Sequence, residues 1–503
     1  MKKIIIPFLF LISSIGIYAQ SIDEAFSIKK MKKDLKAFKE IRLNANSGLY
    51  KYRTKEQIDS IYIWAEKELD KLSTYRDFYN LISTLTDYEG SLHNNTSFPK
   101  KRMKTIKNEK SGYFPFPIKV VDNKIVLNFQ IKDIPLGAEI LSINNQNIDE
   151  IIPELYKYYT TDGINITGKS IGINGSFSKY YRLHFGLKNE FEVTFKEHKS
   201  ANKNTITVKN VGYADYWKKF RNRHSKSSDY ERYEGVKDDE KYKYKQIDEN
   251  TGKLTINSFS IGGDKDSEDH KVYKKWLDSI FTNIKSRNIV NLIIDTRNCG
   301  GGTDPNDVIT YSYLTSRQFQ ESKQVWTTFN KIPLLKYYNS SIPAFLRPLG
   351  VGKFNRYFQK RFPVEKDGKY FISKETNELK ARKPNKNAFT GNVYLLISPR
   401  VASAGSLFSA MVAGNENTIT IGEESMGGYY GHNGHTPFEY VLPKSKIVTE
   451  FSIDNIEQDV PIKSNQFYNR GIIPDYNVQQ TLEDFLNNVD TQMNFTLELI
   501  NKK

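Results

Sequence analysis

The sequence contains very little cysteine: Cys299 is the only one among 503 residues. A single cysteine cannot form an internal disulfide, so the stability of the fold has to come from packed hydrophobic cores. After residue 20 there is no run of the roughly 18 apolar residues that a membrane-spanning helix needs. Zinc-finger spacing and basic repeats are missing too, which argues against nucleic-acid binding. These absences predict a soluble, globular protein.

The longest apolar run lies at the N-terminus, within residues 1–19. Lys2 and Lys3 precede it, and Tyr18-Ala19-Gln20 ends it, which is the pattern of a secretory signal peptide. No cysteine follows this segment to carry a lipid. We therefore expect the mature protein to be exported, either to the periplasm or as a secreted protein.

Basic residues outnumber acidic ones by 74 to 58, which gives a formal net charge of +16. In an exported protein, a basic surface is better suited to acidic peptides or anionic cell-envelope polymers than to nucleic acid. A solvated surface without a partner is equally compatible with this charge. The expectation is therefore a weak association with anionic cell-envelope surfaces at most.

Hydrophobic residues make up 38% of the chain and aromatic residues 13%, and the length predicts three or four globular units. Residues 20–105 have helical periodicity, with Ile58, Ala65 and Leu69 on one helix face, which predicts an N-terminal helical domain. This domain ends in a polar turn that contains His93. A lone histidine in a loop is usually exposed and inert.

Between residues 112 and 200 the pattern changes to short strands and turns. Within it, the segment 134–159, IPLGAEILSINNQNIDEIIPELYKYY, resembles the later half of a PDZ domain, with a helix that flanks a peptide groove. Such a domain binds an extended peptide as an added strand, although a small β domain without a ligand is equally compatible. Residues 201–250 are rich in charge and tyrosine without hydrophobic periodicity, and we interpret them as a charged connector.

Residues 251–490 alternate buried strands with amphipathic helices, which predicts an α/β core. One strand, residues 289–294, continues into three glycines at 300–302, at the end of the strand where open α/β sheets bind ligands. A basic and aromatic insertion, residues 316–387, interrupts this core. It suits either a lid over the site or a subdomain without a role in it.

Ser403 stands between a second apolar strand, residues 393–398, and an amphipathic helix that starts after it. A serine at such a junction lies beside unpaired N–H groups at the positive end of the helix dipole, where an oxyanion is favoured. This position makes Ser403 a candidate nucleophile. The alternative is that Ser403 or Ser406 only caps the helix.

The ordered motifs of this chain resemble the C-terminal processing peptidases and the tricorn group of serine peptidases. They are DTRNCGGG, SPRVASAGS, GEESMGG and GIIPD, which come after a PDZ-like unit and a helical domain. The resemblance implies an α/β multidomain fold with a ClpP/crotonase-like peptidase core. It also implies Ser403 as the nucleophile and the backbone amides of Gly301 and Ala404 as the oxyanion hole.

The resemblance leaves the base of the reaction open. Processing peptidases use a lysine at a position that holds Gly428 here, so a Ser–Lys dyad of that form is excluded. The tricorn-like group takes a histidine from a turn just before the PDZ-like unit, and His93 falls at that place. A histidine near neutral pKa can accept the serine proton and return it to the leaving amine. His432 and His435 are alternative bases.

The group that would orient the base is also open. The residue before Asn469 is tyrosine where the tricorn-like group has a glutamate, so Glu457, Asp459 or a backbone carbonyl would have to orient it, or the group is missing. His432 and His435 could form a weak metal pair. Without a carboxylate in spacing they fall short of a zinc signature, and we predict neither a metal site nor a cofactor.

These features together predict an exported serine endopeptidase that binds the tail of a protein or peptide substrate through its PDZ-like domain. The alternative is a catalytically inactive relative that binds peptides or cell-envelope polymers. The missing lysine and the missing glutamate favour this alternative.

Overall fold

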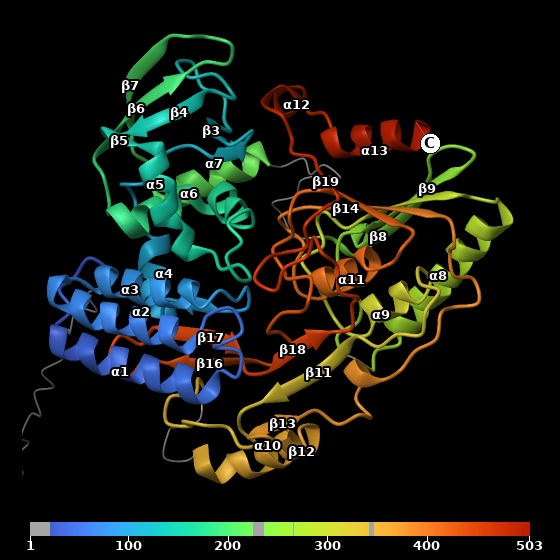
Figure 1. The fold of residues 1–503 in the computed structure, drawn as a ribbon. Helices are drawn as coiled ribbons and strands as arrows, with labels where there is room; N and C mark the ends of the chain where they lie inside the picture. Colours follow the sequence, from blue (N-terminus) through green and yellow to red (C-terminus); the bar gives the residue numbers. More distant parts are fainter. Residues whose placement is uncertain (1–20, 225–235, 265, 342–346, 503) are drawn as a thin grey trace, which may run out of the picture.

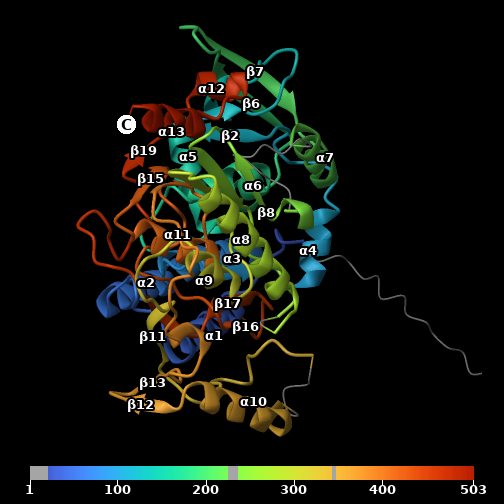
Figure 2. The same cartoon turned by 90° about the vertical axis from the view of Figure 1, so that its right-hand side faces the viewer.

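The computed structural model describes residues 21–502, apart from 225–235, 265 and 342–346. The predicted signal peptide, residues 1–19, lies outside the described residues. The fold is of the mixed α/β class, as predicted, with several sheets and the N-terminal helices packed beside the C-terminal core (Figures 1 and 2). In the described part of the chain, no helix has the length and apolar character to cross a membrane.

A six-stranded sheet lies at the centre of the core, in the order β19-β15-β14-β10-β9-β8. All neighbours are parallel except β8, which runs antiparallel to β9. Because parallel strands end at the same edge, the loops after β10 and β14 meet there. The bounds are β8 (Tyr242–Gln246), β9 (Thr251–Ile256), β10 (Asn291–Asp295), β14 (Asn392–Ile397), β15 (Thr418–Gly422) and β19 (Tyr476–Asn477).

Helices cover both faces of this sheet. On one face, Leu292 and Ile294 belong to a buried cluster with α8 (Asp269–Ser286), α9 (Asn306–Tyr311) and α11 (Ala404–Ala413). On the other face, Ile293 packs with residues of α13 (Thr491–Asn501), which Figure 1 shows across the sheet from α8. Alternate side chains of a strand point to opposite faces, so burial on both sides requires a continuous apolar run such as that of β10.

The N-terminal helices pack around a hairpin from the C-terminal core, in which β16 (Pro437–Val441) pairs with β17 (Val448–Ser452) (Figure 1). Apolar side chains of both regions form one buried cluster. Arg42 lies 4.3 Å from the centre of the Phe451 ring and forms an ion pair with Glu89 at 3.1 Å. The helices are α1 (Ile28–Ala45), α2 (Lys55–Glu68), α3 (Tyr75–Tyr88) and α4 (Lys100–Lys107). This region therefore shares its core with residues far along the chain.

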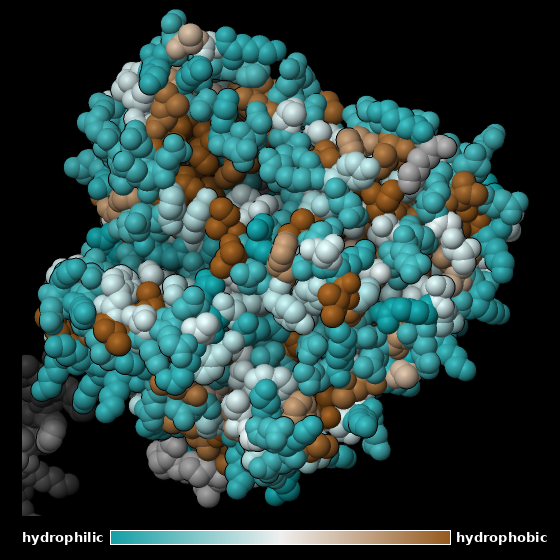
Figure 3. Space-filling view, in the orientation of Figure 1, coloured by the Kyte–Doolittle hydropathy of each residue, from teal (hydrophilic) through white to brown (hydrophobic). Residues whose placement is uncertain are grey.

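A second sheet, in the order β2-β3-β4-β6-β7, forms a unit with its own hydrophobic core. Hydrophobic residues also reach the surface of this unit, as the brown area at the upper left of Figure 3 shows. Its elements are β2 (Ile118–Val121), β3 (Lys124–Leu127), β4 (Glu139–Ile143), β5 (Gln146–Asn147), α5 (Ile148–Leu155), α6 (Lys169–Phe185), β6 (Glu190–Lys196) and β7 (Lys203–Lys209). Its assignment as a PDZ-like domain stays a prediction.

Residues 201–250 differ from the expectation of a charged connector. They contain β7, α7 (Tyr213–Arg223) and β8, which is an edge strand of the central sheet. Only one face of α7 is apolar, and Tyr216 and Phe220 are buried on it. An edge strand and a half-buried helix need few apolar residues, so the high charge of this segment hid them.

The insertion also takes part in the core. It contains β11 (Ser322–Thr327), α10 (Arg347–Arg361), β12 (Val364–Lys366) and β13 (Lys369–Phe371), and β11 pairs with β18 (Asn455–Gln458) from the core. Its buried residues Phe358, Phe362 and Ile372 join the cluster of the N-terminal helices. The described part of the insertion is thus packed into the molecule. The last short helix, α12 (Leu482–Asn487), precedes α13.

Candidate active site

Ser403 connects β14 to α11 through a strained backbone. Its φ of 51° and ψ of −133° fall in a region that residues with a side chain rarely adopt, at a cost of about 1–3 kcal/mol. The strand before it and the helix after it are both buried, so tertiary packing holds the turn in place. The Ser403 side chain makes no hydrogen bond to the start of the helix. The capping role considered from the sequence is therefore wrong for this residue.

The glycine loop after β10 lies directly against Ser403. Asp295, the last residue of β10, is in register with Leu396 of β14, so both strands deliver their following loops to one edge of the sheet. Gly301 has a φ of +115°, and a Cβ atom added there would lie 2.7 Å from Ser403 Cβ and 3.1 Å from the Ala404 nitrogen. Only glycine fits this close approach. Ala404 is the first residue of α11, so its N–H has no acceptor within the helix.

His93 reaches the core because the residues after it form a strand that pairs with the core hairpin. β1 (Asn95–Ser97) pairs antiparallel with β17, and Asn95 lies opposite Glu450. On its other side, the polar turn follows α3, which belongs to the cluster shared with the hairpin. The turn is therefore fixed at both ends to residues of the C-terminal core.

Two residues of the segment 160–162 hold this turn from outside. The buried carboxylate of Asp162 accepts hydrogen bonds from the N–H of Leu92 at 3.0 Å and from the N–H of Gly428 at 2.9 Å. The hydroxyl of Thr160 contacts the carbonyl oxygens of Leu92 at 3.2 Å and of Asn94 at 2.7 Å. Asp162 thus links the histidine turn to the glycine-rich loop of the core. Burial raises the pKa of Asp162 to about 6.

These contacts place the imidazole of His93 beside the serine. Nε2 of His93 lies 3.4 Å from Oγ of Ser403, although the two residues are 310 positions apart in the sequence. Burial, and then the charge of His435, lower the pKa of His93 to about 4, while the backbone carbonyl of Asn433 acts in the opposite sense. His93 is consequently a neutral imidazole at physiological pH. Its Nδ1 is buried, and no described residue forms a hydrogen bond to it.

The geometry of a strained serine, a glycine loop and a histidine agrees with a match to a protein family. Residues 250–478 match the model of peptidase family S41. This part of the chain belongs to peptidase family S41. The match confirms the resemblance inferred from the sequence motifs and places the chain among serine-type peptidases, whose substrates are proteins or peptides. A search of curated protein sequences finds no match.

Solved structures with a similar fold include two of CPAF. Mature CPAF complexed with lactacystin has a TM-score of 0.56 and 13% identity, over 94% of this chain and 100% of that chain. A serine-to-alanine mutant of CPAF has a TM-score of 0.58 and 13% identity, over 91% and 94% of the two chains. The photosystem II D1 C-terminal processing protease covers 90% and 94% at 11% identity, but its TM-score of 0.36 is too low to bear on the fold. At these identities the likeness shows the fold alone.

His432 lies behind His93. The centres of the two rings are 4.7 Å apart, and the planes are tilted by 44°. His432 is fully buried, which is the main reason that its pKa is well below the usual value; the charge of His93 is the next cause. Both of its ring nitrogens lack a hydrogen-bond partner among the described residues. The structure therefore brings His432 to the site, in contact with the ring of His93.

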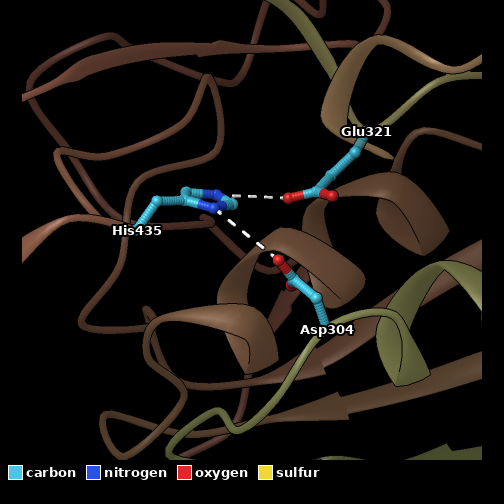
Figure 4. A group of neighbouring side chains, drawn as sticks. All are labelled: Asp304, Glu321 and His435. Carbon is cyan, nitrogen blue, oxygen red and sulfur yellow. Dashed lines mark ion pairs between the residues drawn. The ribbon is translucent and has the colours of Figure 1, made fainter. Parts of the chain in front are cut away.

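His435 points away to a group of carboxylates. Its Nε2 forms an ion pair with Glu321 at 3.2 Å, and its Nδ1 lies 3.8 Å from carboxylate oxygens of both Asp304 and Glu378 (Figure 4 shows Glu321 and Asp304). Burial opposes a charge on this ring, but the contact with Glu321 holds the pKa of His435 well above its usual value. His435 thus does not face Ser403 as an alternative base would.

The two carboxylates considered as orienting groups have other partners. Glu457 accepts a hydrogen bond from Gln324 at 2.6 Å, and Asp459 forms an ion pair with Arg317 at 3.1 Å. Among the described residues, no hydrogen bond or ion pair joins either carboxylate to His93. Against the lowering effect of burial, the group that raises the pKa of the His93 ring is instead the backbone carbonyl of Asn433.

Gly428 stands where the sequence resemblance would place the lysine of a processing peptidase, and it donates its N–H to Asp162. A different lysine, Lys51, enters the neighbourhood from the N-terminal region. Its Nζ donates to the carbonyl of Ile456 at 2.5 Å and to the side chain of Asn455 at 3.2 Å, and burial lowers its pKa to about 8. Lys51 is thereby bound to β18.

Sequence reasoning missed Thr160, Asp162 and Lys51. Thr160 and Asp162 lie in a short polar stretch with glycine, TTDG, which the sequence marks only as a turn. The carboxylates around His435 were also missed, because Asp304 and Glu321 come from other segments of the chain. A buried polar residue in a turn has the same local pattern as an exposed one, so only packing distinguishes them.

Proposed function

We propose that this chain is a serine endopeptidase with Ser403 as the nucleophile and His93 as the general base. The observation that carries the proposal is the 3.4 Å separation of His93 Nε2 and Ser403 Oγ, produced by elements from opposite ends of the chain. This distance is at the long end of a hydrogen bond, and catalytic hydrogen bonds are often long before the substrate binds. The strained backbone of Ser403 supports the same role.

The reaction follows from these positions. Neutral His93 accepts the Ser403 proton as Oγ attacks the substrate carbonyl, and then gives that proton to the leaving amine. The Ala404 N–H at the start of α11 donates to the oxyanion. The Gly301 amide is the second donor in this proposal. This amide also interacts with the buried Cys299 thiol, whose pKa is raised by burial and lowered in part by the amide. To donate to the oxyanion instead, the amide has to be turned toward the substrate by a movement of the glycine loop.

The binding of a substrate tail is assigned to the β2–β7 unit. A pocket of about 380 Å³ lies between this unit and the core, and Val120 of β2, Ile125 of β3 and Ile152 of α5 line it. Residues 398–400, just before Ser403, line the same pocket. An extended peptide added along β2 would therefore lead toward the serine. We include export in the proposal, on the strength of the N-terminal sequence pattern, with a basic surface that associates weakly with the anionic cell envelope.

The second candidate is an inactive relative that binds peptides or cell-envelope polymers. The observation that favours it is the Nδ1 atom of His93, which is buried without a hydrogen-bond partner among the described residues. In a serine–histidine–carboxylate triad, this atom is bonded to a carboxylate that fixes the tautomer. Without that bond, His93 would be oriented only by packing against His432 and by the Asn433 carbonyl.

A fluorophosphonate probe distinguishes the two candidates. The mature wild type, Ser403→Ala, His93→Gln and the control His198→Gln, at an exposed position after β6, are incubated with the probe and with a denatured protein substrate. The peptidase predicts labelling and cleavage by the wild type and the control, and neither by the two site variants. Labelling that survives in His93→Gln would refute His93 as the base. A wild type without labelling or cleavage would favour the binding protein.

Export is tested separately, by fractionating cells that express the full chain with a C-terminal tag. Export predicts a shortened protein in the periplasm or the medium. A full-length protein that stays in the cytoplasm would contradict it. Washing intact envelopes with increasing salt tests the weak association, because contacts between exposed charges are screened above physiological salt.

A further inference from the structure

A compact group of side chains of the types that bind metal ions lies beside the candidate active site. Asp304 follows the glycine loop, Glu321 immediately precedes β11 in the insertion, and His435 belongs to the loop after β15. Figure 4 shows the carboxylates of Glu321 and Asp304 each facing one nitrogen of the His435 ring. One ligand atom from each residue can be chosen so that all three lie within 4.8 Å of one another. Side chains from three separate segments of the chain therefore lie within a few ångströms of one another.

Two fully buried carboxyl groups, those of Glu321 and Asp307, lie in this group beside one imidazole. The Glu321 side chain is 1% exposed, and its Oε1 forms the ion pair with His435 Nε2 at 3.2 Å. Asp307, three residues after Asp304, is completely buried, and both of its carboxyl oxygens lack a hydrogen-bond partner among the described residues. Burial, and then the charges of Glu321 and Asp304, raise the pKa of Asp307 well above its usual value. Glu378 is bound to Arg361 at 2.5 Å. Apart from Glu378, the carboxyl groups of Asp304, Glu321 and Asp307 thus have one imidazole, that of His435, among them.

Burying carboxylates without compensation is costly, and buried charges are normally paired or bound to a metal. An imidazole nitrogen together with carboxylate oxygens suits Zn²⁺ or Mn²⁺, whereas Ca²⁺ prefers oxygen ligands alone. Ligands about 2.0–2.2 Å from a zinc ion lie roughly 3–4 Å from one another. The present separations need only a small contraction. The Asp304 side chain, which is 32% exposed, has the freedom to supply it.

We propose that Asp304, Glu321 and His435 bind one divalent cation of the Zn²⁺ or Mn²⁺ class, with the buried carboxyl group of Asp307 beside it. His435 contributes one ring nitrogen, and each carboxylate contributes an oxygen. A proton on His435 is the competing occupant of the same site. The cation performs no step at Ser403; it fastens the three segments together.

The position of this site gives the cation a structural consequence. Asp304 follows Gly301 by three residues, and His435 follows His432 and Asn433, which act on the ring of His93. A cation between them would fix the glycine loop and the loop behind the histidine at the same time. Binding of the ion is independent of the proposed function. Its effect on catalysis rests on that function, so the test measures binding and activity separately.

The test uses the mature full-length chain after treatment with a chelator. ZnCl₂ and MnCl₂ are titrated separately by calorimetry near neutral pH, and the melting temperature is recorded with and without each ion. We expect one ion per chain for at least one metal and a higher melting temperature in its presence. The variant Glu321→Gln keeps the shape but removes a ligand, and it should bind the ion at least 10-fold more weakly. The matched control Glu457→Gln should bind like the wild type.

Asp304→Asn serves as a second variant in case Glu321→Gln does not fold, because its side chain is partly exposed. The absence of binding by both metals would overturn the proposal and leave the group as an ion pair around a protonated histidine. Binding that is unchanged in both variants would also overturn it, since the ion would then lie elsewhere. Binding without a change in peptidase activity supports the site but removes its catalytic consequence.

Discussion

The position of His93 predicts an unusual dependence on pH. Its pKa is about 4, against an ordinary histidine value near 6.5, chiefly because the ring is buried and secondly because of the charge of His435. One pKa unit corresponds to about 1.4 kcal/mol, so protonation of the folded protein costs roughly 3 kcal/mol more than in solution. Part of the residue remains open to solvent, which makes this figure an upper bound. The base should therefore stay neutral far below pH 6.

Peptidase activity should accordingly persist into acid. The acidic limb of kcat/KM reports the pKa of the base in the free enzyme, so we expect its midpoint between about pH 4 and 5. The measurement is the initial rate of cleavage of a fluorogenic peptide from pH 3.5 to 8 at constant ionic strength. A midpoint at 6 to 6.5 would refute the argument, because it would show a solvated imidazole. His198→Gln, at its exposed position, should leave the profile unchanged.

The same shift has a consequence for stability. Between pH 6.5 and 4 the unfolded chain binds a proton at this residue and the folded chain does not, so lowering the pH favours unfolding. In this window, His93 alone should reduce the free energy of unfolding by up to about 1.4 kcal/mol per pH unit. Below pH 4 both states are protonated, so His93 causes no further loss. Urea denaturation of the wild type and of His93→Gln at several pH values measures the difference. Equal slopes would contradict a buried neutral ring.

Three further predictions concern single residues. Gly301→Ala places a methyl group 2.7 Å from Ser403 Cβ at a φ of +115°; we expect the probe labelling rate to fall at least 100-fold in a folded protein, as judged by circular dichroism. Asp162→Asn weakens the anchor of the histidine turn; kcat/KM should fall, and urea denaturation should show a loss of about 1–3 kcal/mol, whereas unchanged values would remove its positioning role. Arg297→Ala removes one of the two ion pairs of buried Asp295 at 2.8 Å and leaves Lys253 as the remaining partner, so it should cost about 1.5–3 kcal/mol in the same measurement.

Local pattern was enough to locate the serine and the glycine loop. Both follow apolar strands of a parallel sheet, and strands buried on both faces are visible as continuous runs of apolar residues. Since such strands end at one edge, the sequence also implied that Gly301 and Ser403 would meet. The sequence did not distinguish a capping serine from a strained one, because the backbone angles of Ser403 depend on the packing of β14 and α11.

The partners of the serine were decided by contacts between distant segments. Position in the chain made His93 a candidate, but its approach to Ser403 depends on the pairing of β1 with β17 and on the hydrogen bonds of Asp162. His432 and His435 are three residues apart, yet one packs on His93 and the other binds carboxylates. No local pattern separates two such histidines.

By itself, then, the sequence determined the strands, the helices and the chemistry available at the ends of the strands, because hydrophobic periodicity and the small residues at turns act over a few neighbouring positions. Only the tertiary structure decided which histidine faces the serine, that the helical region and the insertion share one core with the hairpin, and that carboxylates gather around His435. These outcomes depend on burial and on pairing between residues far apart in the chain, and such interactions leave no periodic trace in the sequence.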